Sequence, residues 1–176
     1  NEQNDKYNLT LRLFEMGASA LGQSDVLAAA RGVIESVSQE MREAVHVAVL
    51  DDRDIVYVDT ADSAHHALTM SPRIGGRTPA HCTALGRVLL SDKTDEEIRE
   101  LYTDVRLEPR TQHTVTDMEA LLSVIRSVRQ KGIAVDHEEY EEGLMCVATP
   151  LRDRSGAIVA AMALAAPRVR LPGHRI

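Results

Sequence analysis

The feature that most constrains the fold is a change of hydrophobic period between the first two well-marked elements. Ser24 is a candidate N-cap, and the apolar residues after it form a stripe at helical spacing: Val26, Leu27, Ala30, Val33, Ile34, Val37 and Met41. Over 45–49, valines instead alternate with small or polar residues, as the two faces of a β-strand require. Polar residues 51–54 separate this strand from a second one at 55–59, which predicts a hairpin.

Helices return in the middle of the chain, each marked by a signal at one of its ends. One follows the loop 72–79, which contains Gly75-Gly76, and is predicted to end near Leu90. Two capping boxes predict further helix starts, Thr94 with Glu97 and Thr116 with Glu119. Gly132 is placed to end the last helix in a left-handed conformation. The residues of this helix predicted to point inward are Met118, Leu121, Leu122, Ile125 and Val128.

Four more strands are predicted beyond the first hairpin. They cover 66–71, 133–136, 144–151 and 157–165, and a turn at 152–156 joins the last two. Two strand-rich halves with helices between them predict the α+β class, with helices packed on one antiparallel sheet. The regular alternation of strand and helix that a doubly wound parallel sheet needs is missing.

Composition narrows the possible functions. The chain has 176 residues, of which 44% are hydrophobic, and this suits one domain with short extensions. Its net charge of −7 argues against a grip on nucleic acid by this piece alone, because neutralising phosphates needs a basic surface. With two cysteines and no apolar run near ~20 residues, we expect no disulfide scaffold, no membrane span and a cytoplasmic location.

The first candidate binding segment is the glycine-containing loop and the helix start that follows it. A helix start offers backbone N–H groups and a positive dipole end, which suit a carboxylate. The N-cap is either Thr78, with Pro79 at the first helical position, or Thr83, which leaves the amides of Ala84 and Leu85 available. The alternative is that Gly75-Gly76 is only a turn and the threonine only a cap.

The second candidate is the acidic run 136–146. A series of carboxylates such as 138–142 is usually a solvated loop. Asp136 differs, because it ends an apolar strand and can face the interior. Cys146 begins the next apolar strand and is either a ligand contact or a small buried hydrophobe.

The third candidate is the last strand, where Ala161, Ala163 and Ala165 share one face by the period of two. A row of methyl groups leaves space above a sheet for a ligand or for a closely packed helix.

The chain also contains residue types that occur in catalytic and metal sites. Cys146 or Cys82 with His81 or His137 supplies the groups of a thiol nucleophile and its base, and Asp136 adds a possible metal ligand. Neither arrangement has a diagnostic spacing, because the sequence contains no Cys-x-x-Cys and no His-Glu-x-x-His. We therefore predict no catalytic residue, no metal and no cofactor.

Three linked segments resemble the IclR family of bacterial transcriptional regulators. Residues 73–90 are similar to its Gly-x-Arg/Lys-x-Pro loop followed by His-x-Thr/Ser-Ala-x-Gly-Lys/Arg-x-x-Leu. Residues 129–150 resemble its second signature, with Lys-Gly-Ile-Ala-x-Asp and then Glu-Glu-x-x-x-Gly-Leu-x-Cys-Val-Ala-x-Pro. Residues 160–167 resemble its closing strand, and 7–17 its join to the DNA-binding domain. The resemblance covers nearly the whole chain in the same order.

The resemblance implies a sensor rather than an enzyme. The expected fold is a curved antiparallel sheet of about six strands with helices packed on it, similar to GAF and PAS domains. Residues 1–22 correspond to the end of a DNA-binding domain and a linker helix, 23–170 to the effector-binding domain and 171–176 to a tail. The implied partners are a small organic acid or aromatic effector, operator DNA through a winged helix-turn-helix that precedes these residues, and further copies in a homodimer or homotetramer.

The resemblance also assigns ligand-binding positions. These are Met70, Thr78, the amides at Ala84 and Leu85, Asp136, Cys146, Ala163 and Ala165. Relatives that sense small acids carry serines where Ala163 and Ala165 stand, so a larger or less polar ligand is expected here. Two alternatives remain, a Cys146-dependent hydrolase and a GAF-like module of a signalling protein that does not regulate transcription.

Overall fold

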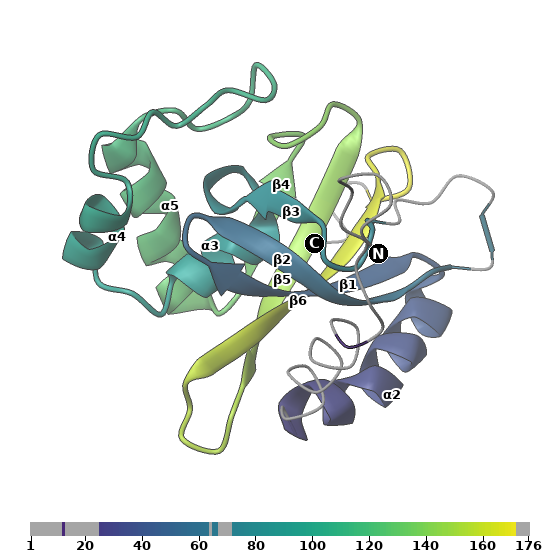
Figure 1. The fold of residues 1–176 in the computed structure, drawn as a ribbon. Helices are drawn as coiled ribbons and strands as arrows, with labels where there is room; N and C mark the ends of the chain where they lie inside the picture. The colour runs from purple at the N-terminus through teal and green to yellow at the C-terminus, as the bar shows by residue number, and fades with distance from the viewer. Residues whose placement is uncertain (1–11, 13–24, 64, 67–71, 172–176) are drawn as a thin grey trace, which may run out of the picture.

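The computed structural model describes residues 12, 25–63, 65–66 and 72–171 of the chain. Its centre is a six-stranded sheet in the order β3-β2-β1-β6-β5-β4, and every neighbouring pair is antiparallel (Figure 1). The strands are β1 (Ala44–Asp51), β2 (Asp54–Ala61), β3 (Arg77–Pro79), β4 (Ala134–His137), β5 (Leu144–Arg152) and β6 (Ile158–Pro167). The predicted α+β class with about six antiparallel strands is confirmed.

Helices cover both faces of the sheet in the described part of the chain. Helix α2 (Asp25–Met41) packs on β1, β2 and β6 from one side, which we call the outer face. Helix α3 (Ala84–Leu90) follows a 3-10 turn (Ala80–Cys82) and packs on β1, β4, β5 and β6 from the other side, the inner face. Helix α5 (Met118–Lys131) packs against α3 and against α4 (Asp95–Leu101), so the inner face carries the thicker helical layer (Figure 1).

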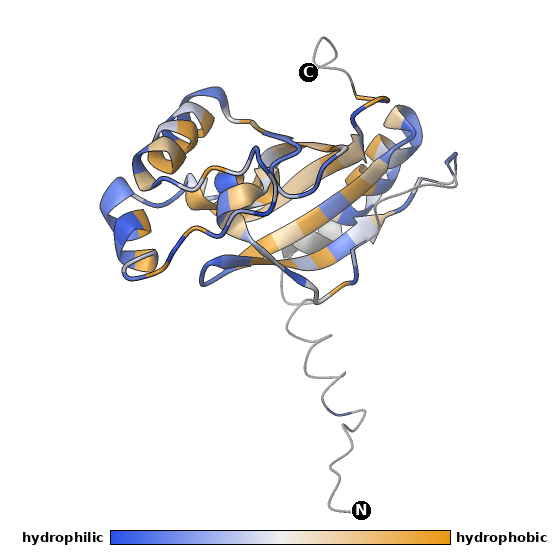
Figure 2. Cartoon of the chain, turned by 90° about the horizontal axis from the view of Figure 1, so that it is seen from above, coloured by the Kyte–Doolittle hydropathy of each residue, from blue (hydrophilic) through white to orange (hydrophobic). Residues whose placement is uncertain are grey.

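Strand alternation divides the interior into an inner and an outer core. Val45 and Val47 point outward and pack with Ile34 of α2, whereas Ala48 of the same strand belongs to the inner core with α3 and α5. Figure 2 shows the apolar strands between helices that mix hydrophilic and hydrophobic residues. In α2 the predicted stripe is only partly buried, because Val33 and Met41 are 51% and 42% exposed.

The helix-end predictions are mostly confirmed. Thr94 and Glu97 form the expected capping box of α4, and Gly132 ends α5 with φ 73°. The inward residues of α5 are buried or packed on the inner core as predicted.

The prediction of Thr116 as the N-cap of α5 was wrong by one residue. Asp117 is the N-cap instead, since its carboxylate accepts the backbone N–H three residues on, and Asp is at least as good a cap as Thr.

The third strand is not where the sequence placed it. Strand β3 lies within 72–79, which we predicted as a loop, and it pairs with β2 at the edge of the sheet. Three residues are too short to show a period, and Pro79 is tolerated at an edge because no N–H is needed there. In the predicted strand 66–71, His66 is outside any strand and the rest lies outside the described residues.

The ends of the chain are only partly described. The predicted strand at 7–11 and, apart from Arg12, the helix at 12–21 lie outside the described residues, as does Ser24. Leu171, predicted as the start of a free tail, is buried and packs near Met145 and Ala166. An apolar side chain at this position is buried against the start of β5 and the end of β6, so the tail prediction was wrong for Leu171. None of the helices that the structure describes has both the length and the apolarity needed to cross a bilayer.

Candidate functional site

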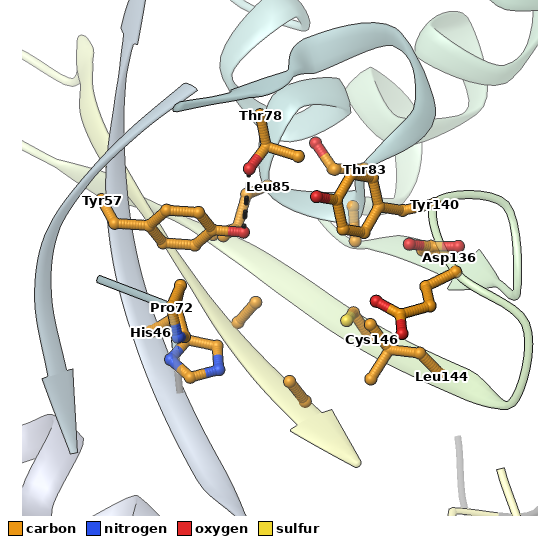
Figure 3. A pocket seen from close by; sticks show the side chains of 14 residues that line it. His46, Tyr57, Pro72, Thr78, Thr83, Leu85, Asp136, Tyr140, Leu144 and Cys146 are labelled. Atoms are coloured by element: carbon orange, nitrogen blue, oxygen red, sulfur yellow. Dashed lines mark hydrogen bonds between the residues drawn. The ribbon is translucent and has the colours of Figure 1, made fainter. Parts of the chain in front are cut away.

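A cavity of about 190 Å³ lies on the inner face of the sheet, between the start of α3 and the loop that follows β4 (Figure 3). Its walls come from all six strands, the α3 segment and two loops. The lining residues are His46, Tyr57, Pro72, Thr78, Thr83, Ala84, Leu85, Asp136, Tyr140, Glu141, Leu144, Cys146, Ala163 and Ala165.

Strand register builds the floor of the cavity. Asp136 of β4 lies opposite Cys146 of β5, which in turn lies opposite Ala165 of β6. One step along the sheet, Ala163 of β6 lies opposite His46 of β1. Directly opposed residues of antiparallel strands point to the same face, so small side chains lie in the middle and polar ones to either side. The alanines therefore leave the space, as their shared face predicted.

The upper wall depends on how α3 begins. The hydroxyl of Thr83 accepts the N–H of Gly86 at 3.1 Å, so Thr83 is the N-cap, one of the two positions that the sequence allowed. Ala84 and Leu85 are then the first helical residues, whose N–H groups have no partner within the helix. Gly86 permits this packing, because a Cβ there would lie 2.2 Å from the carbonyl oxygen of Ala80. The 3-10 turn therefore sits directly against the helix.

Asp136 is the buried acid of the site. It is 1% exposed, and its carboxylate accepts the backbone N–H of Glu139 at 2.7 Å. Burial raises the pKa of Asp136 to about 6, although the amides of Glu139 and Tyr140 act in the opposite direction. A carboxylate has more acceptor positions than these backbone amides use, so Asp136 can also accept hydrogen bonds from a ligand.

A buried ion pair holds the loop that follows Asp136. Nη1 of Arg87 on α3 donates to Oε1 of Glu139 at 2.5 Å, and Nη2 pairs with the other carboxylate oxygen. The third guanidinium nitrogen, Nε, donates a hydrogen bond to the carbonyl oxygen of His81 at 3.2 Å. Glu139 lies in the sequence between Asp136 and Tyr140, which both line the cavity. The ion pair therefore holds the wall formed by these residues against α3, which forms the facing wall.

The opposite end of the cavity is formed by Tyr57, Thr78 and His46 (Figure 3). The Thr78 hydroxyl donates to the Tyr57 hydroxyl at 3.5 Å. Burial raises the pKa of Tyr57 to about 12, so its hydroxyl stays protonated. The ring of His46 meets that of Tyr57 edge-on, with centroids 6.0 Å apart, and its Nδ1 lies 3.0 Å from the hydroxyl of Thr60.

The two thiols are poor nucleophiles in this environment. Burial raises the pKa of Cys82 to about 12 and shifts the pKa of Cys146, which lines the cavity, in the same direction. The ring of His81 is bonded through Nε2 to the carbonyl of Glu108 at 3.1 Å and does not line the cavity. Within the described ranges, no three His, Cys, Asp or Glu residues gather as a metal site requires.

The structure brings together all of the predicted ligand-binding residues except Met70, which lies outside the described residues. Sequence reasoning missed several lining residues: His46, Tyr57, Pro72, Thr83 as a wall residue, Tyr140, Glu141 and Leu144. For His46 a signal was present, because it shares its strand face with two alanines. Tyr57 carried no such signal, because its role depends on the pairing of β2 with β3.

Comparisons with known proteins agree on one family. The profile of the bacterial transcriptional regulator IclR C-terminal domain matches residues 18–176. The HTH-type transcriptional regulator KdgR of Dickeya chrysanthemi is 41% identical over 168 residues, which are 96% of this chain and 55% of that protein. The chain spans between about half and two thirds of the length of the curated relatives it matches first.

Solved structures show the same fold. The C-terminal domain of Escherichia coli KdgR matches with a TM-score of 0.76 and 34% identity, covering 86% of this chain and 87% of that one. The inducer-binding domain of an Acinetobacter PobR double mutant, in complex with 3-hydroxybenzoic acid, matches with a TM-score of 0.77 and 27% identity, covering 84% and 86%. The profile matches most of the chain, and relatives such as KdgR are more than 30% identical to it. This chain therefore belongs to the IclR family of bacterial transcriptional regulators and corresponds to the C-terminal domain of that family.

Proposed function

We propose that this chain is the effector-binding domain of a DNA-binding transcriptional regulator, and that the cavity on the inner face binds the effector. The observation that carries the proposal is the convergence of residues from separate segments on one enclosed space. Thr78, Asp136, Cys146 and Ala163 come from three separate candidate segments of the sequence, and all line the same cavity.

The energetics of Asp136 support a binding role. Its raised pKa means that the charged carboxylate is less favourable in the folded chain than in water, so at neutral pH the residue lowers stability. Buried groups that reduce stability are concentrated at functional sites, where a ligand compensates for them. A purely structural role would be served as well by a neutral residue of the same shape.

The volume and the lining of the cavity also limit the size and polarity of the ligand. Its volume of about 190 Å³ is below the ~300–1,000 Å³ of sites for drug-sized molecules, which favours a small metabolite. The floor of Ala163 and Ala165 offers methyl groups where a serine would offer hydroxyls, which suits the carbon skeleton of an organic acid or an aromatic ring. The PobR domain, which binds 3-hydroxybenzoic acid, is an example of this class in the family.

The remaining parts of the proposal come from the family. The relatives are named as transcriptional regulators, which supports operator DNA as the second partner and a cytoplasmic, non-enzymatic role. DNA contact is assigned to a winged helix-turn-helix outside these residues, because this chain carries a net charge of −7. An effector that prefers one arrangement of a homodimer or homotetramer shifts the population of that arrangement, and DNA affinity changes with it.

The test is a thermal-shift screen against short mono- and dicarboxylic acids, aromatic acids and neutral aromatic compounds. A compound that binds only the folded state raises stability by RT ln(1 + [L]/Kd), about 2.7 kcal/mol at a hundredfold excess over Kd. We expect at least one acid or aromatic compound to stabilise the chain, and Asp136→Asn or Thr78→Val to weaken that effect. Asp92→Asn, an exposed carboxylate outside the cavity, is the matched control.

The outcomes separate the alternatives. Stabilisation by neutral aromatic compounds alone supports the apolar-ligand version of the proposal. A stabilising compound that is unaffected by both cavity variants places binding elsewhere and overturns the site. Turnover of an ester substrate that is lost in Cys146→Ala supports the hydrolase instead.

A further inference from the structure

Polar groups at the two ends of the cavity differ in the hydrogen bonds they can form. One end has two carboxylates, Asp136 in the interior and Glu141 at the exposed rim. The other end has the hydroxyls of Tyr57 and Thr78 beside the ring of His46. Between the ends lie Ala163, opposite His46, and Ala165, opposite Cys146, with side chains too short to interrupt the space.

The acidic end favours a hydrogen-bond donor. An ionised carboxylate only accepts hydrogen bonds, so Asp136 requires a hydroxyl or an ammonium group on the ligand. Among the described lining residues there is no Lys or Arg to offset the charges of Asp136 and Glu141. The nearby guanidinium of Arg87 is already paired with Glu139. A ligand carboxylate at this end would therefore face like charges without a counterion.

The tyrosine end favours a hydrogen-bond acceptor. The Tyr57 oxygen accepts the hydroxyl proton of Thr78, which leaves the proton of Tyr57 available for donation. Thr78 is buried and Tyr57 is half-buried, so this pair is partly shielded from water. Hydrogen bonds are stronger where water is excluded, and stronger again when the acceptor is charged.

We propose that the cavity recognises both ends of its effector, with Asp136 accepting a hydroxyl or ammonium group and Tyr57, supported by Thr78, donating to a carboxylate or carbonyl group. This inference rests on the proposed function and specifies the ligand class for the same site. It makes Tyr57 a specificity-determining residue and identifies a simple monocarboxylate as an incomplete ligand.

The experiment uses compounds that share a five-carbon chain and differ only at their ends. Calorimetric titration compares 5-aminopentanoate and 5-hydroxypentanoate, which have a donor and a carboxylate, with pentanoate, which lacks the donor, and glutarate, which has two carboxylates. We expect the first two to bind about tenfold or more tightly than pentanoate, because each gains a hydrogen bond to the charged Asp136. Glutarate is expected to bind no better than pentanoate.

Two variants assign the ends separately. Tyr57→Phe should weaken pentanoate and 5-aminopentanoate by the same factor, because both carry the carboxylate. Asp136→Asn should weaken only 5-aminopentanoate, which then binds like pentanoate. Tyr102→Phe, which removes a buried hydroxyl outside the cavity, is the matched control and should change neither affinity. Circular dichroism and the unliganded melting temperature establish that each variant is folded.

Three results overturn the inference. These are glutarate binding best, Tyr57→Phe leaving pentanoate binding unchanged, and Asp136→Asn weakening both compounds equally. One of these results can occur while an acid from the thermal-shift screen still binds, with an affinity that depends on Asp136. In that case the cavity remains the effector site, and only the recognition of both ligand ends is wrong. If no compound of either panel binds, both proposals fail.

Discussion

Arg87 of α3 and Glu139 of the loop after β4 form a bidentate ion pair in the protein interior, where they are 1% and 8% exposed. Removing one partner leaves a buried charge without compensation, which typically costs about 3–5 kcal/mol. We therefore expect Arg87→Met to lower the free energy of unfolding by about this amount, measured by urea denaturation. The double variant Arg87→Met/Glu139→Leu should recover most of the loss, because no buried charge remains.

A solvent-exposed pair provides the comparison. Arg99 and Glu119 are also paired but their side chains are 45% and 64% exposed. Arg99→Met should cost less than about 1 kcal/mol, as exposed pairs do. Equal losses in Arg87→Met and Arg99→Met would contradict the role of burial.

Replacing Asp136 by Asn should increase stability while it weakens ligand binding. The pKa of Asp136 in the fold is about 6 against an ordinary value of 3.8, so the unfolded chain releases its proton at lower pH than the folded one. Stability therefore falls as pH rises from about 4 to about 6, and above that the cost is constant at about 3 kcal/mol. Asp136→Asn removes this cost, so its advantage in urea denaturation should be largest near pH 7.5.

The pH dependence of this advantage is the control. Near pH 4 folded Asp136 carries the proton and unfolded Asp136 is only partly ionised, so most of the cost is absent and the difference between wild type and variant should become small. An advantage of the same size at both pH values would show that charge burial at Asp136 is not its cause.

Gly86 should not tolerate a side chain, because a Cβ there would lie within 2.3 Å of the Cα of Ala80 as well as against its carbonyl. Since both atoms are backbone, Gly86→Ala forces the 3-10 turn away from α3, at a cost of about 1–3 kcal/mol or more. At Gly32 in α2, a Cβ would have no other described atom within 4 Å. Gly32→Ala is therefore expected to stabilise the chain by about 0.5–1 kcal/mol through helix propensity. Thermal denaturation of the two variants should shift in opposite directions.

Ala165→Ser places a hydroxyl on the floor of the cavity, opposite Cys146. A ligand that covers this hydroxyl without bonding to it has to desolvate it, at a cost of about 1–3 kcal/mol. For whichever compound stabilises the wild type, we expect Ala165→Ser to raise Kd about fivefold or more, measured by calorimetry. Ala157→Ser, in the exposed hairpin turn, should leave Kd unchanged. A lower Kd in Ala165→Ser would show that the effector is a small carboxylate that seeks hydroxyls there.

Tyr102→Phe should not destabilise the chain. Its hydroxyl is buried and has no hydrogen-bond partner among the residues that the structure describes, and burial raises its pKa. The phenylalanine ring keeps the edge-to-face contact with His81, so only the unsatisfied oxygen is lost. We expect the free energy of unfolding to rise by about 1 kcal/mol, by urea denaturation. A loss of stability would imply an internal water bonded to this hydroxyl.

Local signals in the sequence were sufficient for most elements. The capping box at Thr94, the left-handed Gly132 and the alternating valines of β1 each act within a few residues, so no tertiary contact is needed to interpret them. The same is true of the alanines of β6, whose shared face follows from the strand period alone. These features determined the α+β class, whereas the motifs within 73–90, 129–150 and 160–167 carried the family resemblance, which implied most candidate site residues.

The tertiary structure decided which residues meet. β3 is a strand only because β2 offers its free edge, and the short segment Arg77–Pro79 has no pattern of its own. That pairing brings Thr78 to Tyr57, a contact over 21 positions that no local signal encodes. Likewise, the charge of Glu139 belongs to an acidic run that looked solvated, yet it is buried because Arg87 lies opposite. Local chemistry sets periods and helix ends, but burial, pKa shifts and the two ends of the cavity depend on which strands and helices become neighbours.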